Sequence, residues 1–214
     1  MTLDQRLIDG YRRFLETDFE RDRELYHSLA EEGQTPHTLV IACSDSRVLP
    51  QHVLGAGPGD MFLVRNVAAL VPPFEDDAGY HGTSAAIEFA VTSLGVKNVI
   101  VMGHAKCGGV GCVADGSVTE TSFVGRWVRP LREWLHRHDD LIPKNPTARA
   151  RLLERAAVHL SVENLMSFPF IAERVAAGTL NVEGLILDIS NGELLKVIAK
   201  PDGIFDVQSV LNEG

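Results

Sequence analysis

Two polar segments of this chain each follow an unbroken apolar run, and this arrangement constrains the fold more than any other feature. The apolar runs cover residues 39–42 and 99–102, and the polar segments beyond them start at Cys43 and at His104. A short apolar run without interruption is typical of a strand that is buried on both faces of a parallel sheet. Ligands usually bind where such strands end. We therefore expect both polar segments to contribute to one site at one edge of a sheet.

The rest of the chain alternates predicted strands with predicted helices, which is typical of an α/β fold. A further strand is predicted at residues 61–64, and residues 182–190 and 194–199 flank Asn191-Gly192, a strong hairpin signal. Helical patterns lie at residues 83–94, 123–138 and 147–177. We expect a mainly parallel sheet, with four parallel strands plus one antiparallel edge strand, flanked by helices.

The length of the chain favours one domain. It has 214 residues, of which 45% are hydrophobic, and no linker or internal repeat divides it. Within that domain, residues 1–33 are predicted to form a helical arm and residues 34–214 an α/β core. The arm has an apolar stripe at four-residue intervals, formed by Leu7, Tyr11, Leu15 and Phe19. A stripe at the very terminus often packs on a partner chain.

Composition excludes several classes of protein. The net charge is −9 and no basic stripe is present, which argues against binding to nucleic acid. No apolar run approaches the roughly 18 residues that a membrane-spanning helix needs. The first residues are charged where a signal peptide would be apolar. Three cysteines are too few for a disulfide framework and fit a reducing compartment, so we expect a cytoplasmic protein.

The chemistry of the two polar segments indicates a metal site. Cys43, His104 and Cys107 offer two thiols and one imidazole, a ligand set that favours zinc. The spacing of His104 and Cys107 lets one turn bring both side chains to one ion. Three protein ligands and an open fourth position are typical of a catalytic zinc site. Cys112 could close the site as a fourth ligand, but its place beyond a run of glycines favours an ordinary buried thiol.

A carboxylate and an arginine follow the first cysteine. Asp45 and Arg47 lie on the same side of an extended segment, so that Arg47 can hold Asp45 in a charge-assisted pair. Two thiolates already neutralise Zn²⁺, and a bound carboxylate would make the centre anionic. Asp45 is therefore either a fourth ligand that blocks the metal or an acceptor that orients a zinc-bound water molecule.

Two other catalytic arrangements fit the residues less well. A phosphatase loop needs five residues between its cysteine and its arginine, whereas three residues separate Cys43 from Arg47. A cysteine-hydrolase dyad of Cys43 and His104 is possible. That dyad would leave Cys107 and the pair of Asp45 and Arg47 without a role.

At these residues the chain resembles a β-class carbonic anhydrase, with the pattern of the plant-like subgroup. The signature is Cys-x-Asp-x-Arg followed further along by His-x-x-Cys, and the resemblance runs from Gln34 to Gly109 and weakly to the terminal hairpin. It implies a zinc lyase, carbonate dehydratase, that interconverts carbon dioxide and bicarbonate. It also implies a homodimer in which N-terminal helices wrap the partner, with possible further assembly into tetramers or octamers.

The resemblance also implies the roles of the site residues. Cys43, His104 and Cys107 correspond to the ligands of one Zn²⁺ per chain. Asp45 and Arg47 correspond to a dyad that orients the zinc-bound water, so that zinc-bound hydroxide attacks carbon dioxide.

Four further residues are implied to contact the substrate. Gln34 corresponds to a glutamine that hydrogen-bonds substrate from the neighbouring subunit. Phe62 and Val67 correspond to the apolar wall where carbon dioxide lies, and Gly108 offers a backbone N–H to the developing anion. Phe89 stands where plant-like members carry a tyrosine, so the contribution of that hydroxyl must be absent or replaced.

Two alternatives remain open at the level of the sequence. The same fold could hydrolyse COS or CS₂, which resemble carbon dioxide to the same nucleophile. The chain could also be a non-catalytic zinc-binding module in which Asp45 stays on the metal. The presence of Arg47 argues against the second alternative, because a permanently closed site has little need of it.

Overall fold

The computed structural model describes residues 2–76, 79–200 and 205–212 of the chain. Over these ranges, six strands form one sheet in the order β2-β1-β3-β4-β5-β6. The strands β1 to β4 run parallel, and β5 and β6 are antiparallel to their neighbours. Their bounds are β1 (Thr38–Cys43), β2 (Met61–Asn66), β3 (Asn98–His104), β4 (Asn181–Leu187), β5 (Leu194–Ala199) and β6 (Phe205–Ser209).

The predicted mainly parallel sheet with four parallel strands is confirmed. Where one antiparallel edge strand was expected, the sheet ends in two, because β6 adds to β5. The strand β6 has five residues, and only Phe205 and Val207 are large and apolar. A pattern this short does not stand out in a sequence, although Phe205 is buried against Trp134 of the adjacent helical layer.

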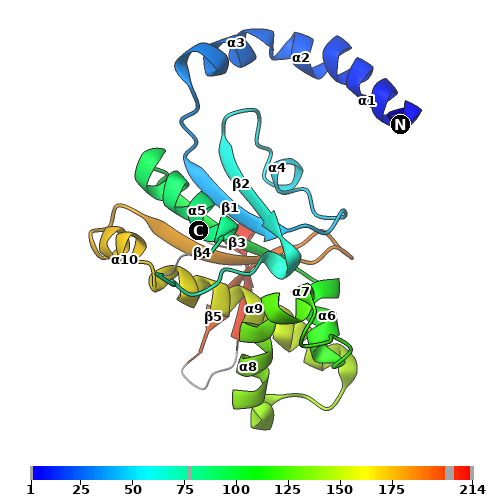
Figure 1. Cartoon of the computed structure of the whole chain (residues 1–214), viewed down its shortest axis with the longest axis vertical. Helices are drawn as coiled ribbons and strands as arrows, with labels where there is room; N and C mark the ends of the chain where they lie inside the picture. The colour runs from blue at the N-terminus through cyan, green and yellow to red at the C-terminus, as the bar shows by residue number, and fades with distance from the viewer. Residues whose placement is uncertain (1, 77–78, 201–204, 213–214) are drawn as a thin grey trace.

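Helices pack mainly on one face of the sheet, and Figure 1 shows the N-terminal helices extending from the body as an arm. Short turns of 3₁₀ or π helix lie at Val67–Ala69, Phe89–Ser93, Asp139–Leu141 and Val210–Asn212. The α-helices are α1 (Gln5–Glu16), α2 (Asp18–Arg21), α3 (Arg23–Glu32), α4 (Pro50–Val53), α5 (Gly82–Glu88), α6 (Gly108–Ala114), α7 (Phe123–Trp127), α8 (Arg129–Arg137), α9 (Pro146–Met166) and α10 (Pro169–Ala176).

The strand β1 divides its side chains between two cores, because successive residues point to opposite faces. Leu39, Ile41 and Cys43 belong to the larger core, which lies under the helices. Val40 and Ala42 belong to a smaller cluster on the other face. The end of β1 therefore delivers Cys43 to the helical side of the sheet.

Two glycines let α9 approach the sheet closely. A Cβ atom at Gly103 of β3 would lie 2.5 Å from Cγ2 of Val158, and one at Gly184 of β4 would lie 2.7 Å from Cγ1 of the same valine. Both distances are shorter than real contacts allow, so any larger residue would push α9 outward. The helix consequently passes directly beside the residues that follow β3.

The arm formed by α1, α2 and α3 has no buried residue in this chain. Leu7 and Tyr11 of the predicted stripe are each 60% exposed. Wrapping of a partner by this arm stays a prediction. Among the helices of the described ranges, none is both long and apolar enough to cross a bilayer.

Candidate metal centre

The structure brings Cys43, His104 and Cys107 together at the carboxyl end of the parallel strands. Cys43 ends β1 and His104 ends β3, and these strands are neighbours at the point where the strand order reverses direction. Cys107 follows after a tight turn in which Lys106 has a left-handed φ of 57°. All three side chains are buried, and their ligand atoms lie within 4.8 Å of one another.

This donor set fits a zinc ion. The two sulfur atoms are 3.9 Å apart, and sulfurs at about 2.3 Å from one tetrahedral ion would be about 3.8 Å apart. Nδ1 of His104 lies 3.0 Å from the carbonyl oxygen of Ala105. Nε2 of His104 is buried and makes no hydrogen bond to any described residue. A buried nitrogen without a partner is costly, and a metal ion at this position would satisfy it.

Backbone N–H groups surround the two sulfur atoms. The donors to Cys43 belong to Asp45 and Ala68, and those to Cys107 belong to Gly109 and Val110 at the start of α6. Hydrogen bonds from N–H groups favour the thiolate form, which is the form that binds metal. The loops around the site therefore support two anionic ligands.

The three ligands affect one another's charge. The hydrogen bond from Cys107 lowers the pKa of Cys43 to about 4. The same contact, together with burial, raises the pKa of the Cys107 thiol. Burial lowers the pKa of His104, but Cys43, the carbonyl oxygen of Ala105 and Asp45 together raise it, so that the pKa lies above its usual value. Without a cation the site thus holds one thiolate readily and resists a second, which is the behaviour expected of a cluster built around a positive charge.

Arg47 holds Asp45 by two parallel hydrogen bonds. Nε donates to Oδ1 at 2.9 Å and Nη2 donates to Oδ2 at 2.7 Å, while the backbone N–H of Arg47 also reaches Oδ1 at 2.9 Å. These contacts keep the pKa of Asp45 well below its usual range. Oδ2 of Asp45 lies 3.8 Å from Nε2 of His104. The carboxylate therefore faces the metal centre while it remains paired with the arginine.

Two residues that the sequence analysis did not place at the site support its loops. Arg65 of β2 donates through Nε to the carbonyl oxygen of Cys43 at 3.0 Å, and through Nη2 to those of Asp45 and Val48. Glu154 of α9 accepts the backbone N–H of Cys107 at 3.3 Å. Burial raises the pKa of Glu154, and the N–H groups that it accepts oppose that shift. The sequence carried one signal for Glu154, which is a charged residue among the apolar positions of a buried helix.

Two of the four residues implied to contact substrate lie beside the ligands. Gly108 directly follows Cys107, and Val67 follows Asn66, the register partner of Cys43. Val67 also lines a cavity of about 670 Å³ between residues 72–75 and 80–84 and the helices α7 and α8. Cys112 is half-buried, lies outside the ligand cluster, and donates from Sγ to the carbonyl oxygen of Gly109.

The structure does not bring the other two substrate residues to the metal site of their own chain. Phe62 pairs with Leu39, which is four residues before Cys43 and therefore about 13 Å away along the strand. Its ring contacts that of Phe89, with centroids 5.8 Å apart. Gln34 is exposed and precedes β1, at the opposite end of that strand from the ligand. Phe62, which was expected in the same wall as Val67, is thus separated from it within one chain by the length of β2.

Comparison with known proteins finds one matching family model. Residues 38–194 match the model described as carbonic anhydrase, a range that contains all three ligands, Asp45 and Arg47. The chain is 36% identical over 193 residues to "Beta carbonic anhydrase 3" of Arabidopsis thaliana, covering 88% of this chain and 74% of the plant protein.

Solved structures give the same result for the fold. The structure of the β-carbonic anhydrase CcaA superposes with a TM-score of 0.83 at 29% identity, covering 95% of this chain and 91% of that one. A structure described among two tetrameric β-carbonic anhydrases of the filamentous ascomycete Sordaria macrospora superposes with a TM-score of 0.79 at 29% identity. That match covers 90% of this chain and 95% of the fungal one.

Proposed function

The chain belongs to the β-class carbonic anhydrases, and we propose that it reversibly hydrates carbon dioxide at a zinc ion held by Cys43, His104 and Cys107. The observation that carries this proposal is the buried cluster of two thiols and one imidazole, with its ligand atoms within 4.8 Å of one another. A carboxylate stands beside the cluster and is held there by an arginine. Three protein ligands leave one position of a tetrahedral ion open for chemistry.

Asp45 and Arg47 would orient the nucleophile. When bound, zinc supplies the nucleophile by acidifying a water molecule, as carbonic anhydrases are known to do. Asp45 presents Oδ2 to the centre and, because Arg47 keeps it ionised, can accept a hydrogen bond there but cannot donate one. Accepting one hydrogen of the water fixes the direction of its remaining lone pair toward carbon dioxide. Arg47 also donates to the carbonyl oxygen of Lys106 at 3.1 Å, which joins the two ligand loops.

Val67 and Gly108 would receive the substrate. Carbon dioxide has no net dipole, so the apolar side chain of Val67 is a suitable surface for it. Gly108 is the first residue of α6, and the first N–H groups of a helix have no partner within the helix. The N–H of Gly108 is therefore available to the oxygen on which negative charge develops during hydration.

Gln34 and Phe62 would act on the metal site of a partner chain. Both lie at the end of β1 and β2 that is opposite the ligands, and Phe89 joins Phe62 there. In an interface with two-fold symmetry, each chain can present this end to the metal site of the other. The fungal relatives are described as tetrameric. We propose that this chain forms at least a dimer, in which the exposed stripe of α1 packs on the partner.

Stopped-flow measurement of carbon dioxide hydration, on protein of known zinc content and from neutral pH to pH 9, tests the proposal. We expect rapid turnover with one zinc ion per chain. The same preparation should be assayed with COS and CS₂. Faster turnover of these sulfur compounds than of carbon dioxide would move the assignment to a hydrolase. Full zinc content without turnover of any of them would support a non-catalytic module.

A further inference from the structure

The helix α9 carries polar side chains on the face that it turns toward the metal centre. Glu154 is 5% exposed and Ser161 is fully buried, although both lie among apolar neighbours. They are seven residues apart, which places them on one side of the helix two turns apart. Buried polar groups are costly unless they are hydrogen-bonded, so each of these side chains must have a partner.

Ser161 and Asn164 hold the turn that follows β2. Oγ of Ser161 accepts the N–H of Val71 at 3.1 Å, and Nδ2 of Asn164 donates to the carbonyl oxygen of Val71 at 2.8 Å. Ala68 and Ala69 of this turn have left-handed φ values of 65° and 54°. Such values are strained for residues other than glycine and persist only where the surroundings fix them. The turn matters for the metal because Ala68 donates its N–H to Cys43.

Glu154 holds the second ligand loop in the same manner. Its carboxylate accepts the N–H of Cys107, with Oε1 at 3.3 Å, and also that of Lys106. Lys106 is the residue with the left-handed φ between His104 and Cys107. Two consecutive N–H groups of a strained turn therefore end on one buried carboxylate.

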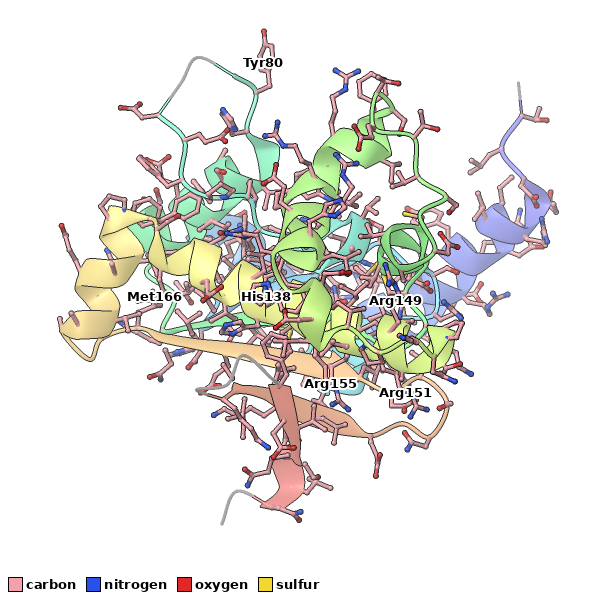
Figure 2. All side chains as sticks on the ribbon, turned by 90° about the horizontal axis from the view of Figure 1, so that it is seen from below. Tyr80, His138, Arg149, Arg151, Arg155 and Met166 are labelled. Carbon is pink, nitrogen blue, oxygen red and sulfur yellow. The ribbon has the colours of Figure 1, made fainter. Side chains whose placement is uncertain are left out.

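The charge of Arg151, on the same helix, lowers the pKa of Glu154 and partly offsets the effect of its burial. Arg151 and Arg155 line a small cavity of about 70 Å³ together with Glu154 and Asp188. Figure 2 shows Arg151 and Arg155 on α9, on the side near the terminal strands of the sheet. Arg151 thus reduces the cost of burying the carboxylate, whose oxygen accepts from the ligand loop. A buried carboxylate that is compensated in this way can act as a fixed acceptor.

We propose that Glu154 is a positioning residue for the metal ligand Cys107. By fixing the backbone of Lys106 and Cys107, it keeps the Cys107 sulfur in place and so determines how tightly the chain holds zinc. This inference rests on the proposed function only in placing zinc at the three ligands. Without the carboxylate, the N–H groups of Lys106 and the buried Cys107 lose their acceptor, and the left-handed turn at Lys106 loses its restraint.

Zinc affinity, measured by competition with a chelator, tests this role. We expect Glu154→Leu to raise the zinc dissociation constant by about 10- to 100-fold, the usual range for residues that orient a metal ligand. Glu154→Gln keeps a carbonyl oxygen as acceptor and should recover most of the affinity. Glu163→Gln is the matched control, because it removes the same charge from an exposed position of α9 and should leave the affinity unchanged.

Two further measurements separate positioning from a general loss of structure. Co²⁺ substituted for zinc should show altered thiolate-to-metal absorption in Glu154→Leu and a nearly normal spectrum in Glu154→Gln. Thermal unfolding of the metal-free proteins identifies any variant that fails to fold. If Glu154→Leu is one, Glu154→Asp takes its place, because its shorter side chain withdraws the carboxylate from the ligand loop, and wild-type zinc affinity in that variant would overturn the role.

Wild-type affinity in both Glu154 variants would overturn the inference while leaving the proposed function intact. Wild-type protein that binds zinc without hydrating carbon dioxide would overturn the proposed function and leave the positioning role measurable. Wild-type protein without zinc would overturn both.

Discussion

At the scale of single residues, Arg47 determines what Asp45 can do. Both oxygens of Asp45 are bonded to the guanidinium group, yet Oδ2 remains 3.8 Å from Nε2 of His104. Pairing with a cation competes with binding of the carboxylate to a metal ion. We infer that Arg47 keeps Asp45 as a hydrogen-bond acceptor and prevents it from closing the site as a fourth ligand.

The first prediction follows from this competition. Arg47→Ala should lower kcat/KM for carbon dioxide hydration by about 10²-fold or more, because Asp45 is then free to bind the metal and no longer orients the nucleophile. Stopped-flow kinetics measures the rate, and the spectrum of the Co²⁺ form reports the added ligand. Arg6→Ala is a matched control, since Arg6 pairs with Asp4 in the same local geometry on the exposed arm. Equal activity in both variants would contradict the role of the pair.

A second prediction concerns stability and pH. Arg47 lowers the pKa of Asp45 in the folded state. The pair therefore contributes stability above the unfolded pKa of about 3.9, and this contribution is lost as the pH falls through the lower folded pKa. Because the arginine is exposed to solvent, Arg47→Ala should reduce the free energy of unfolding of metal-free protein only slightly near neutral pH.

Urea unfolding of wild-type and Arg47→Ala protein, from neutral pH down to about pH 2.5, measures this difference. We expect the two curves of stability against pH to converge at the acid end. A difference in stability between the two proteins that grows as the pH falls would contradict this account of the pair.

The sequence could predict the metal ligands and their neighbours because they lie within two short segments. Cys43, Asp45 and Arg47 act through local spacing, as do His104 and Cys107. Glu154 and Arg65 were not predicted as part of the site. Both bond to backbone groups of distant loops, and spacing along the chain carries no signal for such contacts.

At the scale of elements, the closeness of α9 to the sheet determines where both ligand loops are held. The helix touches β3 and β4 because Gly103 and Gly184 have no side chains to separate them. It then reaches the turn after β2 through Ser161 and the loop after β3 through Glu154. A shift of this helix would move both halves of the metal centre together.

The third prediction tests this packing. Gly103→Ala should destabilise the protein by about 1–3 kcal/mol, because the added Cβ would meet Val158 at 2.5 Å. It should also weaken zinc binding through the displacement of Glu154. Gly10→Ala, in the interior of α1 with no close neighbour beyond the end of Arg13, should instead be neutral or slightly stabilising. Denaturant unfolding measures both, and equal stability of Gly103→Ala and wild type would contradict the account.

Sequence patterns predicted β1 and β3 well because each contains an unbroken apolar run with a sharp end. The run 39–42 became β1 and the run 99–102 became the centre of β3. The additional strand β6 was missed because two apolar residues in five form no distinctive pattern. Gly103 and Gly184, which let α9 approach the sheet, are single residues in their strands. Their effect depends on which helix packs on them, and the sequence alone does not show that.

At the scale of the whole molecule, the residues proposed to form the site lie at two opposite ends of the strands within one chain. Cys43, His104 and Cys107 meet within the chain, whereas Gln34 and Phe62 lie at the far end of β1 and β2. The exposed stripe of the arm offers apolar surface for a partner. Assembly and catalysis should therefore depend on one another.

The fourth prediction joins these two properties. Leu7→Glu combined with Tyr11→Glu should shift the protein toward the monomer, because two charges replace the apolar stripe of α1. Activity per zinc ion should fall as the monomer fraction rises, because Gln34 and Phe62 then no longer reach the metal site of a partner chain. Light scattering and stopped-flow kinetics measure the two effects. Gln5→Glu, which adds a charge elsewhere on the same helix, should change neither, and a fully active monomer would refute the shared site.

The sequence could predict the fold class and the family, because both depend on local patterns. It could not establish which residues act across an interface, since that depends on how two chains meet. The division into an arm (residues 1–33) and a core (residues 34–214), the assembly beyond a dimer and the cytoplasmic location stay predictions.

The central claim is that hydration of carbon dioxide takes place at one zinc ion bound by Cys43, His104 and Cys107. The most direct test removes the metal with a chelator and follows the hydration rate as zinc is added back in known amounts. We predict that activity rises linearly and levels off at one zinc ion per chain, and that Cys107→Ser neither binds that ion nor regains activity. Activity that is independent of zinc, or a chain with one bound zinc ion and no hydration at any pH, would contradict the claim.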